Sequence, residues 1–370
     1  MNVPKLRFKE FNDEWIETKI QNVATVIGGG TPSTDEPKYW GNEINWFTPS
    51  EIGKTKYVTI SNRKISQDGL KNSSAKLLPK GTILLSSRAT VGEASILLNE
   101  ASTNQGFQSL IVNENNCNEF IYYLKYKYKR EMLIKSFGST FLEISKSNVE
   151  NIKIKIPSKE EQFMIANFLS LLDKKIELQS KKIEDLKLFK KGLLQKQYNY
   201  IKDKNLVELS YIANIYQPQT ISQNKLDNGK YFVFGANGII GKYSRYNHKQ
   251  KQITISCRGE NSGKVNITPE KCWITGNSMV LNTDNNYNVD KIYLKCVLDS
   301  QNLRYLISGS GQPQITRNVI LKHKIPLLPI LEQKKFRNPF IKLDLKIHLE
   351  ETKVNKLLDI KKGLMQDMFV

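Results

Sequence analysis

A long amphipathic helix pattern occurs twice in this chain of 370 residues, and the second copy follows the first at an offset of 171 positions. The first copy spans residues 157–198 and contains the run KKGL at 190–193, which recurs at 361–364. In each copy apolar residues are spaced alternately by four and three, which is the heptad pattern of helices that pair through one apolar seam. The predicted seam consists of Ile165, Leu169, Leu172, Ile176, Ile183, Leu186 and Leu193 in the first copy and of Phe336, Phe340, Leu343, Ile347, Val354, Leu357 and Leu364 in the second. A repeat of this length predicts a molecule built as two halves.

Polar residues interrupt both seams at the same two places. Gln179 and Glu350 occupy the first place, and Lys190 and Lys361 occupy the second. Because a polar residue in a seam costs stability and fixes one register, these breaks predict a defined pairing of the two helices within the chain. The alternative is that each helix packs independently on its own domain.

Pro339 is the main difference between the two copies, since the first copy has Phe168 at the equivalent position. Proline removes a backbone donor and clashes with the preceding turn. The second helix is therefore predicted to start late or to kink at this residue. Otherwise each helix could run for about 40 residues, or roughly 60 Å at ~1.5 Å per residue.

The segments that precede the helices repeat more weakly. KGTILLSSRATVGEASIL at 80–97 matches KQITISCRGENSGKVNI at 251–267, which places Arg88 opposite Arg258. Short alternating apolar runs separated by Gly, Asn and Pro indicate strands and turns. The predicted fold class is therefore α+β, with a mixed, strand-rich domain before each long helix. The predicted boundaries are 1–156 and 201–325 for the domains and 157–200 and 326–370 for the helices.

The net charge of +20 is concentrated on the predicted domains, because residues 201–325 alone carry 17 basic and 8 acidic side chains. A basic surface of this kind favours a polyanion, and nucleic acid is the most common polyanion in a cell. Compositional bias is the alternative, since the chain contains 47 lysines and only nine arginines. Such a bias explains the choice of Lys over Arg, but it does not explain the surplus over acidic residues.

Sequence signals for catalysis, metal binding and membrane insertion are missing. The four cysteines and three histidines are scattered without ligand spacing, so no metal site and no disulfide framework is predicted. The glycines at 28–30 are not followed by the GK[ST] of a phosphate-binding loop, and the sequence at 338–340 lacks the second proline of an adenine methyltransferase tetrapeptide. No run of eighteen apolar residues and no apolar amino-terminal segment occur, so a cytoplasmic, non-catalytic protein with no membrane partner is predicted.

The order of these parts resembles the specificity subunit of type I restriction-modification systems over essentially the whole chain. The resemblance is carried by GGTPST and FTPSEI early in the chain, LPKGTILLSSRATVGEASI and TNQGF in mid-domain, and IPSKEEQFMIANFLSLLDKKIE with LKKGLLQ in the helix. It implies two target-recognition domains joined by two long antiparallel coiled-coil helices with a pseudo-two-fold internal repeat. Each domain would read one half of a bipartite, asymmetric site in double-stranded DNA.

The resemblance also implies the partners. The helices would hold the recognition domains apart and dock two methyltransferase subunits, and the restriction subunits would join them. No cofactor is expected on this chain, whereas S-adenosylmethionine, ATP and Mg are expected on the partner subunits. A two-module scaffold that is held by a coiled coil and binds no DNA remains the alternative.

Candidate DNA-contacting residues follow from base chemistry. Arginine suits guanine and Asn or Gln suits adenine in the major groove, whereas lysine on phosphates adds affinity without sequence information. The residues predicted to bind DNA are Thr31, Ser33, Thr48, Ser50, Arg88, Asn104 and Gln105 in the first domain and Gln217, Gln219, Asn237, Arg258, Asn261, Asn277 and Gln314 in the second. The alternative for each is a local role, since Asn and Ser in turns usually bond their own backbone. Arg88 and Arg258 are the strongest candidates because they occupy corresponding places in both halves.

Overall fold

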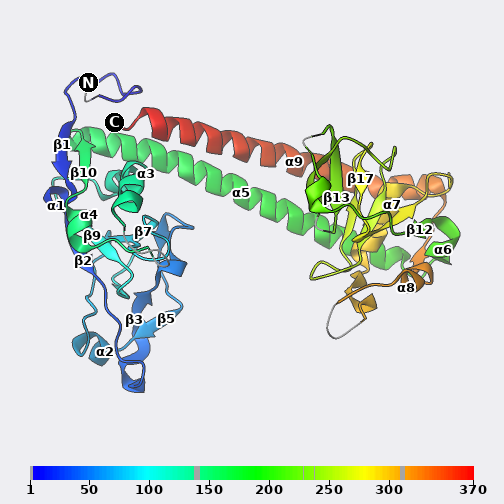
Figure 1. Cartoon of the computed structure of the whole chain (residues 1–370), viewed down its shortest axis with the longest axis horizontal. Helices are drawn as coiled ribbons and strands as arrows, with labels where there is room; N and C mark the ends of the chain where they lie inside the picture. Colours follow the sequence, from blue (N-terminus) through cyan, green and yellow to red (C-terminus); the bar gives the residue numbers. More distant parts are fainter. Residues whose placement is uncertain (1–2, 137–141, 228, 237, 309–312) are drawn as a thin grey trace. The chain divides into compact units, whose positions relative to one another are not determined.

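A computed structural model describes residues 3–136, 142–227, 229–236, 238–308 and 313–370 (Figure 1). The chain divides into two compact units. Unit 1 consists of Met1–Leu178 with Lys353–Val370, and unit 2 consists of Gln179–Thr352. Each unit therefore contains one strand-rich domain together with the adjoining parts of both long helices.

The domain of unit 1 is built on a five-stranded sheet in the order β2-β9-β6-β7-β4. These strands are β2 (Ala24–Gly28), β9 (Gln108–Val112), β6 (Ile83–Leu85), β7 (Ala94–Leu97) and β4 (Tyr57–Val58). A three-stranded sheet contains β5 (Arg63–Ile65), β3 (Trp40–Phe47) and β8 (Ser102–Thr103), and a two-stranded sheet pairs β1 (Ile16–Lys19) with β10 (Lys153–Ile156). The α-helices are α1 (Ile20–Val23), α2 (Gln67–Lys71), α3 (Asn118–Lys135) and α4 (Lys146–Glu150), and the 3-10 helices are η1 (Pro37–Tyr39) and η2 (Pro49–Glu51).

The domain of unit 2 repeats this plan without a counterpart of β4 among the described residues. Its four-stranded sheet runs β12 (Asn214–Tyr216), β18 (Ser278–Asn282), β15 (Ile253–Ser256) and β16 (Val265–Ile267). A three-stranded sheet contains β14 (Gly238–Tyr243), β13 (Tyr231–Gly235) and β17 (Trp273–Ile274), and β11 (Leu206–Glu208) pairs with β19 (Lys324–Pro326). The helices are α6 (Leu209–Ile212), η3 (Gln223–Lys225), α7 (Lys291–Ser300), η4 (Leu303–Leu306) and α8 (Arg317–Leu321). The same strand order in both domains, including one parallel pair in each three-stranded sheet, confirms the predicted α+β class with an internal repeat.

The two long helices are α5 (Lys159–Ile201) and α9 (Ile330–Asp367). Within unit 2, Gln179 of α5 donates a hydrogen bond to Glu350, and Lys190 lies 2.5 Å from Asp344. The later residue of α5 thus contacts the earlier residue of α9, so the helices are antiparallel, as predicted. Unit 1 contains the reciprocal ion pair, in which Asp173 of α5 lies 2.5 Å from Lys361 of α9.

These contacts show how the repeated sequence encodes the pairing. Position 179 meets its own equivalent, position 350, and the Asp173–Lys361 pair is the counterpart of the Asp344–Lys190 pair. The helix pair therefore has pseudo-two-fold symmetry. Partly exposed ion pairs contribute only about 0.2–1 kcal/mol each, so their main effect is on register rather than on stability.

The predicted seam residues face inward along both helices. Ile165, Leu169, Ile183, Phe336, Phe340 and Ile347 are buried, and Leu172, Ile176, Leu186, Leu193, Leu343, Val354, Leu357 and Leu364 are half-buried. The ends of the helices also complete the domain cores. Ile165 and Leu169 of α5 join Met365 of α9, and Met368 just after it, in the core of unit 1 around Trp15, Phe120 and Tyr128. Phe336 and Phe340 of α9 join Leu194 and Ile201 of α5 in the core of unit 2, around Tyr293 and Leu298.

Pro339 does not delay the second helix, which begins at Ile330 and includes the proline, so the predicted late start is wrong. The neighbouring Phe336 and Phe340 are buried in the core of unit 2, and Arg337 lies 2.8 Å from Asp290. A proline inside a helix costs about 3 kcal/mol. Burial of two phenylalanines at about 1.5–3 kcal/mol each offsets that cost.

Candidate nucleic-acid interface

In the first domain, three of the predicted DNA-contacting residues, Thr31, Asn104 and Gln105, lie on the loops that follow β2 and β8. Thr31 donates a hydrogen bond to Oε1 of Gln105, and Oδ1 of Asn104 accepts one from the backbone of Gly106 at 2.9 Å. The close approach of these loops requires Gly29, because a Cβ atom there would lie 2.0 Å from the Asn104 carbonyl oxygen. The glycine run at 28–30 is thus a packing device that brings polar loops together.

Arg88 lies beside this group in the loop that follows β6. The backbone N–H of Ser87 donates to the Gly106 carbonyl at 2.8 Å, which fixes the position of the arginine backbone. The Arg88 guanidinium is 2.8 Å from Oε1 of Glu143 and its side chain remains 44% exposed. The ion pair holds the arginine in a defined position while leaving it accessible to a ligand.

In the second domain the predicted residues gather around Cys257, which the sequence did not single out. Nε2 of Gln217 donates to the Cys257 sulfur at 3.0 Å, and the Cys257 N–H donates to the Asn277 carbonyl at 3.2 Å. Burial raises the pKa of the Cys257 thiol, so the thiol remains neutral. The next residue, Arg258, is exposed and forms a backbone bridge with Gln314, just as Arg88 does with Glu143.

Three further candidates of the first domain have local roles or stand apart from this group. Thr48 caps η2 in a capping box, in which its side chain accepts from the Glu51 N–H and Oε2 of Glu51 accepts from the Thr48 N–H at 2.8 Å. Ser50 is exposed and lies 3.1 Å from the Thr48 hydroxyl. The Ser33 hydroxyl accepts from the backbone of Asp35 at 3.3 Å. The alternative of a local role therefore applies to Thr48 and Ser33.

The remaining candidates of the second domain lie near the Cys257 group or outside the described residues. Gln219 is exposed on the loop after β12. Asn261 lies in the turn after Arg258, where its carbonyl accepts from the Lys264 N–H at 3.0 Å. Asn237 lies outside the described residues.

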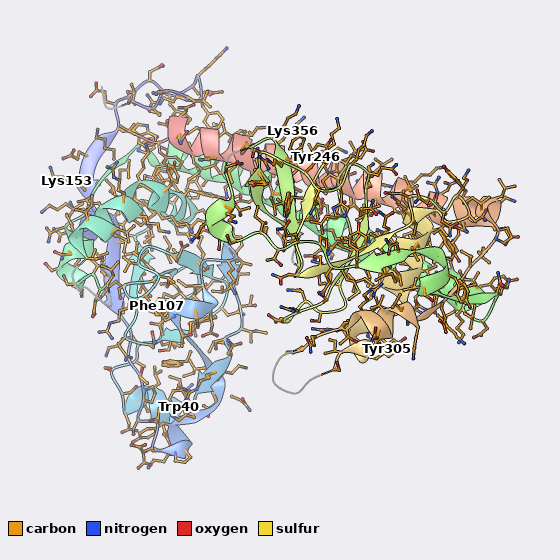
Figure 2. All side chains as sticks on the ribbon, turned by 45° about the vertical axis from the view of Figure 1, so that its right-hand side comes forward. Trp40, Phe107, Lys153, Tyr246, Tyr305 and Lys356 are labelled. Carbon is orange, nitrogen blue, oxygen red and sulfur yellow. The ribbon has the colours of Figure 1, made fainter. Side chains whose placement is uncertain are left out.

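Each three-stranded sheet carries an aromatic and basic surface that was also missed from the sequence. In the first domain the Arg63 guanidinium lies 3.6 Å from the centre of the Trp40 ring, and Figure 2 shows Trp40 at the end of this domain that is farthest from the helix pair. In the second domain the Lys242 amine lies 5.7 Å from the centre of the Phe232 ring. The available signal was aromatic residues on β3 and β13 with basic residues on the neighbouring strands β5 and β14, because such pairs suit nucleic-acid bases and phosphates.

The helix pair carries large exposed apolar side chains next to its seam. In unit 1 these are Leu171, Leu178 and Ile360, and in unit 2 they are Phe189 and Leu349, all more than half exposed. Each directly precedes a seam position, so the side chains of one helix lie on one side of it. Exposed apolar residues thus flank the seam in each unit. We call these five residues the apolar face of the helix pair.

Other kinds of site were sought in the part of the chain that the structure describes. Within it, no group of three or more His, Cys, Asp and Glu side chains could hold a metal ion. The four cysteines are buried and unpaired. None of the helices formed by the described residues is long and apolar enough to cross a membrane.

Comparison with known proteins gives consistent matches. The family described as "Type I restriction modification DNA specificity domain" matches residues 12–188 and again residues 201–359. The MjaIX specificity subunit of Methanocaldococcus jannaschii is 42% identical over 177 residues, which span 47% of this chain and 41% of the relative. The EcoprrI specificity subunit of Escherichia coli is 25% identical over 345 residues, which span 86% of this chain and 84% of the relative.

Solved structures show the same fold. The S subunit of a type I restriction-modification system from M. genitalium aligns with a TM-score of 0.64 at 20% identity, over 100% of this chain and 99% of that protein. A structure described by the words "Structural basis underlying complex assembly and conformational transition of the type I R-M system" aligns with a TM-score of 0.61 at 16% identity.

Proposed function

Because the chain belongs to the type I restriction-modification DNA specificity family, we propose that it recognises a bipartite, asymmetric DNA site and directs methyltransferase and restriction subunits to it. Members of this family are specificity subunits rather than catalysts. One observation carries the proposal. Arg88 and Arg258 occupy equivalent places in the two domains, but the polar residues around them differ. Two domains of the same fold, with different residues around the two arginines, suit two half-sites of different sequence.

The two arginines have the chemistry to read guanine. The Arg88–Glu143 ion pair is partly exposed, so releasing it costs at most about 1 kcal/mol. A bidentate contact of arginine with guanine contributes about 1–3 kcal/mol of discrimination, which exceeds that cost. Around Arg258 the candidate partners are amides from Gln217, Asn277 and Gln314, which suit adenine. The second domain is therefore proposed to read a different half-site from the first.

The apolar face of the helix pair is the proposed docking surface for methyltransferase subunits. Exposed Leu and Ile at heptad spacing next to a seam suit the apolar stripe of a further amphipathic helix. Because each unit carries exposed apolar residues next to the seam, we propose that two methyltransferase subunits bind, one to each unit. Restriction subunits would join that assembly, and S-adenosylmethionine, ATP and Mg would be held by these partners.

DNA binding tests the proposal directly. Mapping of methylated adenines in the host genome, with and without this gene, gives the candidate site. Binding of the chain with its methyltransferase partner to that duplex, and to an unrelated duplex, is then measured at several salt concentrations. A site-specific affinity that falls with salt is expected, because phosphate contacts release counterions. Absence of salt-dependent binding would reject the proposal in favour of a two-module scaffold that binds no DNA.

A further inference from the structure

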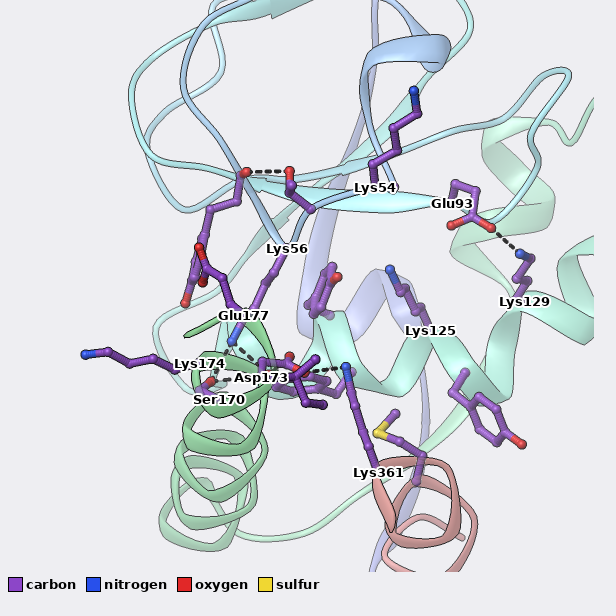
Figure 3. Close-up of a pocket in the computed structure, with 18 residues that line it drawn as sticks. Lys54, Lys56, Glu93, Lys125, Lys129, Ser170, Asp173, Lys174, Glu177 and Lys361 are labelled. Atoms are coloured by element: carbon purple, nitrogen blue, oxygen red, sulfur yellow. Dashed lines mark hydrogen bonds and ion pairs between the residues drawn. The ribbon is translucent and has the colours of Figure 1, made fainter. Parts of the chain in front are cut away.

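A cleft of about 930 Å³ lies in unit 1 between the domain and the adjoining helix segments. Its walls come from β4 with the preceding loop, from α3, and from the unit 1 portions of α5 and α9 (Figure 3). Small-molecule sites typically enclose about 300–1,000 Å³, so the cleft has the volume of a ligand site. Because β4 has no counterpart among the described residues of unit 2, the cleft belongs to one half of the repeat.

A polar network braces the closed side of the cleft. Nζ of Lys56 lies 2.9 Å from Oε2 of Glu119 and 3.1 Å from the Tyr123 hydroxyl, which in turn donates to Asp173 at 2.7 Å. Asp173 also pairs with Lys361 at 2.5 Å. The network ties β4, α3, α5 and α9 together, so the walls are held in place before any ligand arrives.

Lys125 of α3 is the exceptional group in this cleft. Its amine points into the space between β4 and α9 (Figure 3). Its hydrogen bond goes to the Ala94 carbonyl at 3.3 Å, and it lies 4.1 Å from the centre of the Tyr122 ring. Among the described residues no carboxylate lies within 4.0 Å of this amine, so the charge is partly buried without an ion-pair partner.

The charges that face Lys125 explain its ionisation. Burial lowers the pKa of Lys125 to about 8, while Glu93 and Asp173 oppose this effect and Lys361 and Lys129 reinforce it. Glu93 is already paired with Lys129, and Asp173 with Lys361. An added anion at this amine would favour its charged form.

The walls also provide aromatic surface. Tyr57, Tyr122 and Tyr126 line the cleft, and Tyr57 and Tyr126 are 37% and 43% exposed. Lys54 and Lys174 lie at its rim. Lysine amines bind phosphate as point charges, and exposed aromatic rings stack on bases. Amines and aromatic rings on facing walls are therefore suited to a ligand that carries both a phosphate and a flat ring.

We propose that this cleft binds a phosphorylated nucleoside, with the phosphate at Lys125 and the base against the tyrosines. The ligand has two possible sources, a free nucleotide or a nucleotide of bound DNA. The DNA source rests on the proposed function, whereas binding of a free nucleotide does not.

The test uses this chain and the variant Lys125→Met, which keeps an unbranched side chain one atom shorter and removes the charge. Binding of ATP and of inorganic pyrophosphate is measured by calorimetry, with Lys181→Met on the exposed surface of α5 as the control. If the source is a free nucleotide, Lys125→Met weakens ATP binding about tenfold, as expected for loss of one charge-assisted hydrogen bond. ATP should bind more tightly than pyrophosphate, and its affinity should fall as pH rises above about 8.

The same variants are assayed on duplex DNA across a salt series. If DNA is the source, ATP does not bind, but Lys125→Met lowers the slope of affinity against salt by about one. If neither ATP binding nor the DNA salt slope responds to Lys125→Met, the proposal is overturned. If Lys125→Met fails to fold, ATP binding and the DNA salt slope are measured instead on the double variant Lys54→Met with Lys174→Met, which changes only rim residues. Failure of the unaltered chain to bind DNA would reject the proposed function without deciding the free-nucleotide result.

Discussion

Replacement of Gln333 tests whether the repeated glutamine locks each long helix onto its domain. Gln333 is fully buried, and its side-chain oxygen accepts from the Asp290 N–H at 2.8 Å. Its amide donates to the carbonyls of Asn288 and Leu328, both at 2.7 Å. Gln333→Glu keeps the shape but cannot donate, so it places a carboxylate against two carbonyls.

The expected loss can be worked from these bonds. Leaving a buried polar group unpaired costs about 1–3 kcal/mol, and two carbonyls lose their donor. We therefore expect Gln333→Glu to lower the free energy of unfolding of unit 2 by about 3 kcal/mol at neutral pH. For a unit of this size such a loss corresponds to a decrease in Tm of roughly 6–12 °C.

Calorimetry measures the stability, and hydrogen exchange with mass spectrometry locates the effect. The amides at the start of α7 should exchange faster, because Asp290 is the N-cap of that helix. Gln162 makes the same contacts in unit 1, where it accepts from the N-cap of α3 and donates to the Pro157 carbonyl. Gln162→Glu should therefore act on α3 instead. The exposed Gln195→Ala serves as the control, with little change in either unit expected.

The reasoning would be refuted by a specific result. If Gln333→Glu and Gln195→Ala had the same Tm within about 2 °C, buried pairing at Gln333 would not stabilise the unit. Equal exchange at α3 and α7 in both variants would show that the two glutamines do not act locally.

Four other predictions concern DNA, partners and the helix pair. Arg258→Ala should cost about 1–3 kcal/mol on the cognate duplex if the side chain reads guanine, and an equal loss on unrelated DNA would assign it to phosphate. Leu349→Lys should weaken association with the methyltransferase subunit in gel filtration without lowering Tm, and unchanged association would exclude this part of the apolar face from docking. Lys190→Asp should lower the stability of unit 2 by up to about 1 kcal/mol in calorimetry, and the added exchange Asp344→Lys should restore it unless the pair is not formed in solution. Removing one heptad from each long helix should shorten the gap between half-sites by about 10 Å at ~1.5 Å per residue, and an unchanged gap in methylation mapping would contradict the role of the helices as a ruler.

The helix pairing could be predicted from the sequence because its cause is local periodicity. Heptad spacing places the seam on one side of each helix, and the matched polar breaks indicated one register. The partners of those breaks could not be predicted in the same way. Gln179 meets its own equivalent, Glu350, but Lys190 meets Asp344 rather than Lys361. In an antiparallel pair only the central positions meet their equivalents.

Other parts of the site depend on contacts between distant segments. Cys257 organises the second cluster only because Gln217 and Asn277 reach it from other loops, 40 and 20 residues away. Its apolar environment is set by the packed sheet, which no local pattern reveals. At Pro339 the sequence rule that proline interrupts a helix gave the wrong start for α9, because burial of the flanking phenylalanines stabilises the helix through the proline.

The long helices contribute residues to the cores of both domains. Each domain is completed by the beginning of one long helix and the end of the other, as Ile165 and Met365 show in unit 1. A shift in helix register would therefore move core residues and would lower the stability of the adjoining domain. The matched polar breaks then have two effects, because the same Asp–Lys pairs that set the register also keep both cores complete. Under the proposed function, substitution of Arg88 or Arg258 would alter specificity without this cost, because both arginines lie outside the shared cores.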